Sequence, residues 1–574
     1  MAHRRIVILG GTLAGPTAAA RAREVDEDAD IIVVQRGSHL SFSFAGLHHH
    51  LSGEVPSLSG LDQQDAAFFR DYYGVTTLLR TEATAMDIVK RTLTVKNDDG
   101  ILILPWDTFV FALGAESLSV AGLSGSNVWH LRTFADAKNI HDCVTQGGKS
   151  IAVIGGGSFG IEAVDGLIRA GARVTVIEQN AGLLPRFSSS VSGVLLEHLR
   201  ARADVHLGVS VVGSECASVG GKITRLKLSN GTCVDVDGVV VCVGVKPRTA
   251  LLKAAGVQLG DDGTVAVNLR AEVGGVEGLY ACGASVAVPS VVTGNTMWWA
   301  QAAIADKVAQ VGGENAAGGH AAFAPFTGSM LVRAIDLTVG RSGLSYQEAA
   351  AAFGAADVDR TLVPGQSHER WFPGSMPLLV EIFSRRTTGR LLGVEACGAV
   401  GIDKRIDVAA AALTGALTVE QLASLDLGFA GAFNASRDVL NTAGSIAAAE
   451  RAGTACSITP TELHARSDWQ LVDVRTIANV PGLPGAVALP LHALRARLGE
   501  LDQQRPTVVF STRGRRGWLA MRLLRQRGFL DVRNLAGGLM SLLGEQPTTT
   551  TTTTTTAAAT ATTTATTTAT KNKA

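Results

Sequence analysis

The chain has 574 residues, enough for three or four domains, and its 46% apolar and 18% charged residues argue against a disordered or coiled-coil protein. The 51 basic and 51 acidic residues cancel, so the charge gives no reason to expect a nucleic acid or an anionic membrane surface as a partner. The seven cysteines are scattered and form no C-x-x-C pair, which excludes a disulfide scaffold and a zinc ribbon. No apolar run is long enough to span a membrane, which excludes an integral membrane protein. We therefore expect a cytoplasmic protein without a metal site.

The N-terminal half contains one pattern twice: an apolar strand, a glycine-rich turn, an alanine-rich helix and a second apolar strand. The first copy covers residues 6–34, with its helix ending near Arg23, and the second covers residues 151–177, with its helix ending near Ala170. Two such β-α-β openings predict two parallel-sheet domains that bind nucleotides.

The second turn, Gly155-Gly156-Gly157-Ser158-Phe159-Gly160, is a complete G-x-G-x-x-G between a strand and a helix. Such glycines permit a tight turn and let a pyrophosphate approach the backbone at the start of the helix. Glu178 ends the second strand, where a carboxylate can accept hydrogen bonds from ribose hydroxyls and repel a 2′-phosphate. We therefore predict an NADH site, with NADPH less favoured, formed by Gly155, Gly157, Gly160 and Glu178.

The first turn is less regular, because Thr12 stands where the second glycine belongs and Gln35 replaces the expected acid. The amide of Gln35 can still hydrogen-bond a ribose hydroxyl, although it is a weaker acceptor than a carboxylate. We predict that this turn also binds an adenosine-containing cofactor. The predicted contacts are Gly10, Gly11, Thr12, Gly15, Gln35 and Arg36.

The rest of the chain predicts two further domains and a tail. After Arg248, short strands and turns return the chain to the first domain. An α+β pattern follows, with a strand at 378–383 and an apolar helix at 408–417, and then an α/β pattern with strands at 470–473 and 507–510. The predicted α/β fold has domains at 1–120 with 249–325, at 121–248, at 326–449 and at 456–545, followed by a disordered Thr/Ala-rich tail at 546–574.

Several stretches besides the two turns resemble a known family. They are residues 108–115, 279–284, 336–344 and 401–407 and, near the C-terminus, 473–475, 483–486 and 534–538. Together they resemble the pyridine nucleotide-disulfide oxidoreductases, and most closely the coenzyme A-disulfide reductases and NADH oxidases that carry a C-terminal rhodanese domain. The resemblance, over about residues 4–545, implies a flavoprotein with two Rossmann-like nucleotide-binding domains for FAD and NADH, an α+β dimerisation domain that makes a homodimer, and a rhodanese-like α/β domain.

The resemblance also assigns roles to single residues. Glu162 matches the family glutamate beside the nicotinamide, and Arg21 and Arg23 match basic residues that approach a coenzyme A-type ligand. Further cofactor contacts implied by the match are Ala112, Gly114, Gly283 and Ala284 for FAD, and Gly244.

The sequence departs from the family at residues that would carry electrons or hold the flavin. The family's redox cysteine corresponds to Ala45, and a methyl group cannot form a thiolate or a mixed disulfide. The family's Gly-Asp pair, whose carboxylate holds the flavin's ribityl chain, reads Gly283-Ala284, so with Gln35 two anchors of FAD are missing. We expect FAD to be retained through the remaining, mostly backbone contacts, and disulfide reduction by the family mechanism to be lost.

The rhodanese-like domain has lost its cysteine as well. Its active loop, Cys-x-x-Gly-x-Arg in the family, reads Ser511-Thr512-Arg513-Gly514-Arg515-Arg516. A serine hydroxyl is too weakly acidic to accept sulfur without an adjacent base, so we expect no sulfur transfer. Backbone N–H groups flanked by Arg513 and Arg516 still suit an anion, although a solvated basic loop is an equal interpretation.

Two further residues are candidates for chemistry. His48 lies where the flavin-facing helix begins and could donate a proton, because imidazole titrates near neutrality, but a partly exposed helix start explains it more simply. Cys282 could replace the missing thiol, but its apolar neighbours favour a buried structural cysteine.

We therefore expect an NAD(P)H oxidoreductase that passes electrons through FAD to a small organic molecule, a quinone or oxygen. A non-catalytic relative that binds nucleotides and uses its rhodanese-like module to bind an anion or a partner is the alternative. A disulfide or polysulfide reductase that uses another thiol is the third hypothesis.

Overall fold

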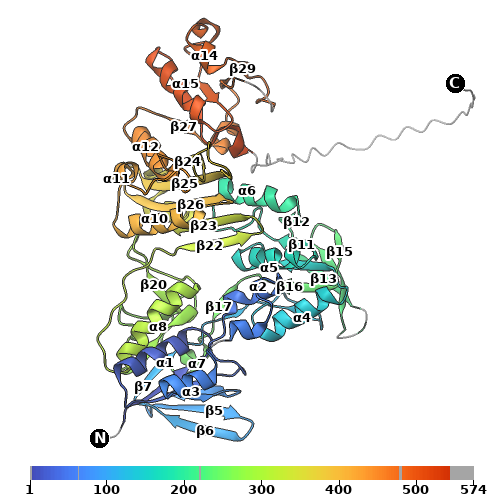
Figure 1. Ribbon diagram of the computed structural model, residues 1–574, viewed down its shortest axis with the longest axis vertical. Coiled ribbons are helices and arrows are strands. Elements are labelled where there is room, and N and C mark those ends of the chain that lie inside the picture. The colour runs from blue at the N-terminus through green and yellow to red at the C-terminus, as the bar shows by residue number, and fades with distance from the viewer. Residues whose placement is uncertain (1–2, 63, 217, 219–220, 477–480, 543–574) are drawn as a thin grey trace, which may run out of the picture.

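The computed structural model describes residues 3–62, 64–216, 218, 221–476 and 481–542, and the predicted tail at 546–574 lies outside them. In Figure 1 the N-terminal domain lies at the bottom, the second domain to its right, the α+β domain above them and the C-terminal domain at the top. Parallel sheets form the first, second and fourth parts and an antiparallel sheet forms the third, which confirms the predicted fold class. Among the described helices, none has both the length and the apolar character that a membrane span requires.

The first part is a parallel sheet covered by helices, with a small antiparallel sheet attached. Its elements are β1 (Arg5–Leu9), α1 (Ala14–Val25), β2 (Asp30–Val34), α2 (Leu47–Leu51), α3 (Ala66–Tyr73), β3 (Thr76–Leu78), β4 (Glu82–Asp87), β5 (Thr92–Asn97), β6 (Gly100–Pro105), β7 (Thr108–Phe111), β8 (Ala115–Ser117), α7 (Ala250–Ala254), β18 (Val265–Ala266), β19 (Leu279–Ala281), β20 (Val286–Pro289), β21 (Thr296–Met297) and α8 (Ala302–Ala316). The strand order β19-β7-β1-β2-β3 puts the glycine turn after β1 at the centre of the carboxyl edge. Helix α8, which the sequence pattern did not predict, packs on α1 so closely that a Cβ at Gly313 would lie 2.2 Å from the carbonyl oxygen of Ala18.

The second part repeats this arrangement. Its elements are β9 (Val128–Trp129), α4 (Phe134–Thr145), β10 (Ser150–Ile154), α5 (Ser158–Arg169), β11 (Arg173–Glu178), α6 (Ser189–Arg200), β12 (Asp204–Leu207), β13 (Val211–Cys216), β14 (Ile223–Leu228), β15 (Cys233–Asp235), β16 (Gly238–Val241) and β17 (Val245–Pro247). The sheet order β12-β11-β10-β16-β9 again centres the strand that precedes the glycine turn. Strand β17 pairs with β8 of the first part, so the two nucleotide-binding folds are joined beside both turns.

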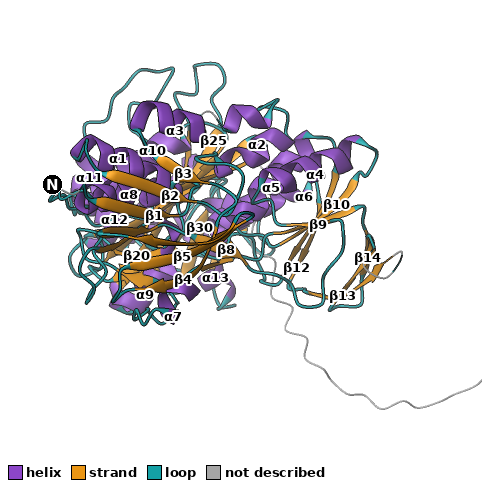
Figure 2. Ribbon diagram, turned by 90° about the horizontal axis from the view of Figure 1, so that it is seen from below, coloured by secondary structure: helices purple, strands orange, loops and turns teal. Residues whose placement is uncertain are grey.

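The third part is an antiparallel sheet of order β22-β23-β26-β25-β24. Its elements are β22 (Met330–Ala334), β23 (Leu337–Gly343), α9 (Tyr346–Phe353), β24 (Val358–Gln366), β25 (Pro377–Arg385), β26 (Leu391–Gly398), α10 (Ile402–Thr414), α11 (Val419–Ser424) and α12 (Val439–Arg451). The helix predicted at 408–417 is wrong at both ends, because Gly401, at φ +73, starts α10 six residues earlier and Gly415 ends it. Seen from below, helices lie on both sides of the strands (Figure 2), and α6 of the second part packs against this sheet.

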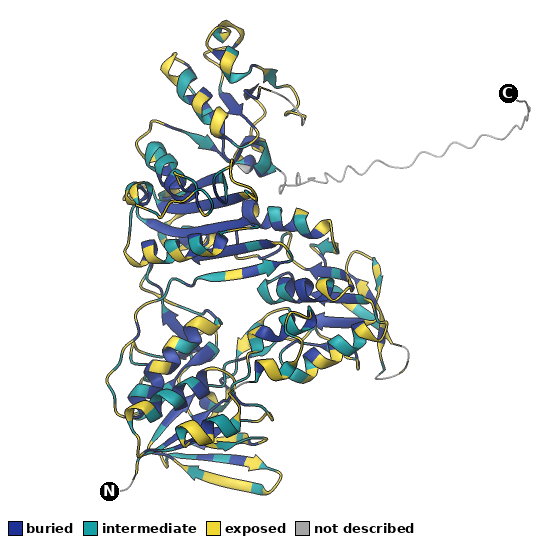
Figure 3. Ribbon diagram, viewed as in Figure 1, coloured by how far each residue is buried: buried dark blue, intermediate teal, exposed yellow. Residues whose placement is uncertain are grey.

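The fourth part is a small parallel sheet of order β27-β31-β30-β28-β29. Its elements are β27 (Ser457–Ile458), α13 (Pro460–His464), β28 (Gln470–Asp473), β29 (Val487–Ala488), α14 (Leu491–Leu494), β30 (Thr507–Phe510), α15 (Arg515–Gln526) and β31 (Val532–Leu535). The strands predicted at 470–473 and 507–510 are confirmed as β28 and β30. Buried residues follow the central strands of every part, whereas outer helix faces and strands β5 and β6 are largely exposed or partly exposed (Figure 3).

Candidate functional site

The turn between β10 and α5 has room only for glycine at two positions. A Cβ at Gly155, whose φ is +107, would lie 2.3 Å from the carbonyl oxygen of Cys242, and one at Gly160 would lie 1.9 Å from that of Gly155. Gly157 faces open space, and α5 begins behind it without a side-chain cap. Glu178, 5% exposed, accepts a hydrogen bond from the Gly156 N–H at 2.6 Å, so its carboxylate is fixed beside the turn. This arrangement fits a dinucleotide whose pyrophosphate meets the helix N-terminus.

The first turn has the same geometry. A Cβ at Gly10 would lie 2.3 Å from the carbonyl oxygen of Ala112, and one at Gly15 would lie 1.7 Å from that of Gly10. Gln35 takes the place of the carboxylate, with its amide oxygen accepting from the Gly11 N–H at 3.3 Å. Helix α1 also begins without a side-chain cap, so its first N–H groups are open. The backbone therefore fits the pyrophosphate of FAD, although one predicted contact, Thr12, lies on the exposed side of the turn.

The other residues predicted to contact FAD lie around this turn. Gly283 is close to the start of α1, since its Cβ would lie 3.1 Å from that of Ala14, and the Ala284 carbonyl accepts from the Trp298 indole at 3.0 Å. Gly114, at φ +64, faces open space. Arg36 is exposed and forms an ion pair with Glu82 at 3.4 Å. The first turn, residues 112–114 and residues 283–284 thus form one side of a cofactor site without a carboxylate at 35 or 284.

A cavity lies where the first and second parts face each other. It brings together four residues that the sequence predicted separately: Ala45, His48, Glu162 and Gly244. Its complete lining consists of Phe44, Ala45, Leu47, His48, Ser117, His130, Leu131, Arg132, Phe159, Glu162, Val241, Cys242, Gly244 and Val245. Ala45 therefore lines the same cavity as Glu162 of α5, so the predicted site of the missing thiol is part of this cavity.

Two titratable groups of the cavity are strongly perturbed. Burial, together with the charge of Asp165, raises the pKa of Glu162 to about 7. Burial, assisted by His49, lowers the pKa of His48 to about 4, so its imidazole is neutral at physiological pH. The expectation that His48 lies at a partly exposed helix start and titrates near neutrality is therefore wrong, because the residue is only 9% exposed and its helix, α2, packs against α5.

Arg132 and Cys242 line the cavity, although the sequence did not predict them as site residues. The guanidinium of Arg132 lies over the rings of Phe44 and Phe159, at 4.3 and 5.6 Å from their centres, and pairs with no carboxylate in the part of the chain that the structure describes. Cys242 is partly buried, and desolvation of its thiol raises the pKa to about 12. Arg132, Phe159 and Cys242 come together within the second part, and the first part adds Phe44, so no local motif indicates this group.

Other candidates are engaged elsewhere. Arg21 pairs with Glu24 at 2.7 Å and with Glu314 at 2.6 Å, and Arg23 donates to the Tyr73 carbonyl at 2.7 Å. Cys282 is fully buried, and burial raises its pKa to about 12, as expected for a structural cysteine.

The predicted anion loop lies between β30 and α15. Ser511 is 3% exposed, and Gly514, at φ +81, precedes the first turn of α15. Burial and the charge of Arg370, from the third part, lower the pKa of Arg513. Within the described residues, Arg370, Arg513 and Arg516 have neither an ion pair nor a hydrogen-bond partner for their side chains.

Comparison with known proteins covers all four parts. The chain matches the family described as pyridine nucleotide-disulphide oxidoreductase over residues 4–306, the dimerisation domain of that family over 332–430, and the rhodanese-like domain over 459–545. It is 26% identical over 434 residues to an NAD(P)H sulfur oxidoreductase (CoA-dependent) of Pyrococcus abyssi, which covers 75% of this chain and 95% of that protein.

Two solved structures have nearly the same architecture. The crystal structure of reduced Bacillus anthracis CoADR-RHD is similar with a TM-score of 0.89 at 25% identity, covering 95% of this chain and 98% of that one. An NAD-dependent persulfide reductase from A. fulgidus is similar with a TM-score of 0.88 at 28% identity, covering 94% and 99%.

Proposed function

The chain belongs to the pyridine nucleotide-disulphide oxidoreductase family, whose members are FAD- and NAD(P)H-dependent oxidoreductases, and from this premise we propose that it transfers electrons from NADH to an acceptor other than a disulfide. One observation carries the proposal: the cavity keeps Glu162 next to the NADH turn and presents the methyl group of Ala45 where the family motif has its redox cysteine. The nucleotide side of the reaction therefore has its residues, while the disulfide side lacks its nucleophile.

The two glycine turns would hold the two cofactors. Gly10 and Gly15, with the 112–114 and 283–284 segments, would hold FAD, and Gln35 would replace the usual acid at its ribose. Gly155, Gly157 and Gly160 would hold NADH, and the buried carboxylate of Glu178 would accept from its ribose hydroxyls and repel the 2′-phosphate of NADPH. FAD, when bound, would accept a hydride from NADH and pass the electrons to the acceptor.

The cavity residues would control water, charge and protons around the cofactors. Phe44 and Phe159, whose ring centres are 5.4 Å apart, exclude water from the space between α2 and α5. Glu162, with its pKa near 7, can hold a proton on its carboxyl group at physiological pH. The guanidinium of Arg132 donates to the Ala115 carbonyl at 3.3 Å but has no carboxylate partner among the described residues, so it favours an acceptor that carries or develops negative charge, as a small organic oxidant, a quinone or oxygen does.

Anaerobic titration of the purified protein with NADH, followed by the flavin absorbance, tests this function. We expect NADH to bleach the flavin, and we expect turnover with a quinone or oxygen but none with coenzyme A disulfide. A colourless protein that still binds NADH would support the non-catalytic alternative. Disulfide turnover that is lost on Cys282→Ser would favour the third hypothesis, against which the buried thiol now argues.

A second candidate function concerns the rhodanese-like module. We propose that the loop at Ser511 binds a small anion, since the charge of Arg370 from the third part acts on Arg513 and neither side chain has an ion pair among the described residues. The test is thermal unfolding with and without phosphate or sulfate: stabilisation that disappears in Arg513→Ala supports it, and an equal response of both proteins contradicts it.

Two partner assignments remain proposals. A coenzyme A-type ligand, which the name of the Pyrococcus relative includes, would have to displace Glu24 and Glu314 from Arg21. A homodimer is consistent with the matched dimerisation domain, on which Trp371 and Phe429 are 73% and 57% exposed. Size measurement in solution tests the second.

A further inference from the structure

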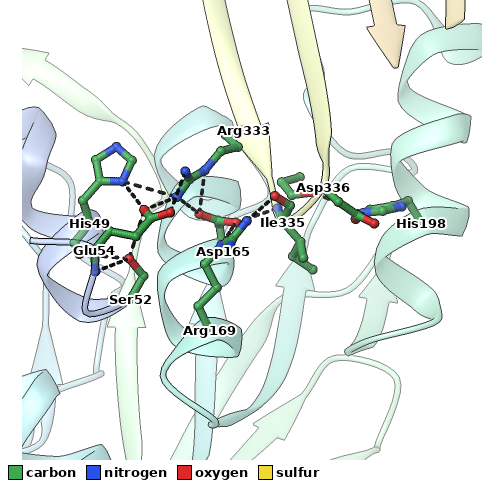
Figure 4. Close-up of polar contacts among 10 residues, drawn as sticks. His49, Ser52, Glu54, Asp165, Arg169, His198, Arg333, Ile335 and Asp336 are labelled. Carbon is green, nitrogen blue, oxygen red and sulfur yellow. Dashed lines mark hydrogen bonds and ion pairs between the residues drawn. The ribbon is translucent and has the colours of Figure 1, made fainter. Parts of the chain in front are cut away.

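A buried carboxylate lies one helical turn beyond Glu162 on α5. Asp165 is 0% exposed and accepts hydrogen bonds from Nε and Nη2 of Arg333 at 3.2 and 2.8 Å, from Nε of Arg169 at 3.0 Å and from the backbone N–H of Ile335 at 2.6 Å. Arg333 and Ile335 belong to the β22–β23 hairpin of the dimerisation domain, whereas Asp165 belongs to the NADH-binding fold (Figure 4). The end of this hairpin therefore docks on the helix that carries Glu162.

The same guanidinium also reaches the FAD-binding fold. Nη1 and Nη2 of Arg333 donate to the two carboxylate oxygens of Glu54 at 3.0 and 2.6 Å, just beyond the end of α2. Glu54 is held in turn by Ser52 at 3.2 Å and by the ring of His49 at 2.8 Å. Figure 4 shows Arg333 between Glu54 and Asp165. One side chain from the third domain thus joins carboxylates of the first two.

The two helices that Arg333 joins are in direct contact behind the cavity. A Cβ at Gly166 would lie 2.6 Å from the carbonyl oxygen of His48, so α2 and α5 touch through their backbones at this point. Glu162 and His48 both line the cavity, and each lies on one of these helices. A shift between α2 and α5 would therefore change the separation of the two groups.

We propose that Arg333 is a positioning residue, which fixes Glu162 and His48 relative to each other by bridging Asp165 and Glu54. This role rests on the proposed function, because that function assigns work to the cavity. Ile335 is consistent with a fixed hairpin: it is a β-branched residue at φ +64, and its N–H donates to Asp165.

Charge gives the bridge a measurable signature. The charge of Asp165 raises the pKa of Glu162, and that of Arg333 lowers it. The charges of Asp165 and Glu54 raise the pKa of His48, and those of His49 and Arg333 lower it. His130, Arg132 and Cys242 are the other titratable groups of the cavity lining. Removing the charge of Arg333 should raise both pKa values, and removing that of Asp165 should lower both. A general loosening of the domains would not give opposite shifts.

The experiment compares Arg333→Met, Asp165→Asn and Arg333→Lys with the control Arg186→Met. Arg186 pairs with Glu348 at 2.6 Å, so it also connects the NADH-binding fold with the dimerisation domain, but it does not line the cavity. The pH dependence of NADH affinity is measured by NADH fluorescence, and kcat and KM are measured with a quinone.

We expect the midpoint of the pH dependence of NADH affinity, near pH 7, to rise in Arg333→Met, to fall in Asp165→Asn and to stay unchanged in Arg186→Met. We expect kcat of Arg333→Met to fall on the order of 100-fold with a smaller change in KM, because small misplacements of cavity groups cost that much. Arg333→Lys, which keeps the charge, should recover the midpoint.

Midpoints that move in the same direction in both variants, or that move equally in Arg186→Met, would overturn the proposal. If Arg333→Met does not fold, the other two variants test the proposal. The midpoint of Asp165→Asn must then fall, and that of Arg333→Lys must equal the wild-type midpoint. NADH binding needs no turnover, so a wild-type protein that binds NADH without reducing its flavin would refute the proposed function and leave the binding test of Arg333 intact.

Discussion

A buried pair of carboxyl groups lies in the antiparallel sheet, and we predict that Glu395→Gln removes a pH dependence of stability. Glu395 on β26 is directly opposite Glu381 on β25, and both are at most 1% exposed. Arg360 pairs with Glu381 at 2.8 Å and the Ser188 N–H donates to Glu395 at 2.7 Å, yet in the described structure each glutamate keeps one buried oxygen without a partner. Burial and the charge of Glu381 raise the pKa of Glu395 to about 7.

The sign and size of the effect follow from linkage. A carboxyl group with a pKa of about 7 in the folded protein and an ordinary value of 4.5 binds an extra proton in the folded state between these pH values. Its stabilising contribution is therefore complete below pH 4.5 and is lost as the pH rises through 7. At about 1.36 kcal/mol per pKa unit, ionisation costs roughly 3 kcal/mol above pH 7. Glutamine resembles the neutral acid at every pH, so Glu395→Gln should be about as stable as wild type near pH 4.5 and roughly 3 kcal/mol more stable at pH 8.

Thermal unfolding between pH 4.5 and 8.5 measures this difference. For a protein part of this size we expect Tm to rise by roughly 6–12 °C at pH 8 and hardly at all near pH 4.5. Glu348→Gln is a control of opposite sign, because Arg341 and Arg186, against the effect of burial, lower the pKa of Glu348 to about 2. That variant should lose stability at pH 8 and lose less as the pH falls. A Tm difference for Glu395→Gln that is negative at pH 8, or the same at every pH, would refute the reasoning.

Three further predictions concern the cofactor site, the missing thiol and the dimerisation domain. Glu178→Ala should weaken NADH binding at least about tenfold and NADPH binding less, since a charge-assisted hydrogen bond is worth roughly 1.5–3 kcal/mol; equal losses in a fluorescence titration would contradict the role of Glu178. Ala45→Cys should gain coenzyme A disulfide turnover that the control Ala45→Ser lacks; no gain would show that more than the thiol is missing. Arg405→Met should lower the free energy of unfolding by about 3–5 kcal/mol, because it leaves Asp438, 2% exposed, without its partner at 2.7 Å; a Tm equal to that of wild type would contradict this.

The parts of the fold that could be predicted from the sequence are those fixed by local patterns. Both glycine turns and the strands around them were predicted, because a turn that excludes any Cβ leaves a run of glycines between apolar strands. Helix α8 was not predicted because its glycines interrupt the helical pattern. Gly313 packs closely against Ala18, and this contact is formed only in the tertiary structure. The limits of the domains stay a prediction.

The cavity could be predicted only in part for the same reason. A motif pointed to Ala45 and Glu162 separately, but Arg132 and Cys242 approach Glu162 through the tertiary fold of the second part, and Ala45 joins them because the first part packs against the second. The neutral state of His48 likewise depends on burial against α5, which the run of three histidines does not reveal. Charge states in such a site follow from packing and not from residue type.

The structure also bears on the choice between an oxidoreductase and a non-catalytic relative. Binding a nucleotide needs only the glycine turns, which act through their backbones and would survive the loss of every other group. The cavity nevertheless keeps Glu162 partly buried, with the fully buried carboxylate of Asp165 behind it, and burying a charged group costs free energy unless it finds a partner. Arg333 and Ile335 provide partners for Asp165 from another domain. A protein that only bound NADH would gain nothing from this arrangement, which costs free energy. The arrangement therefore favours an oxidoreductase over a non-catalytic relative.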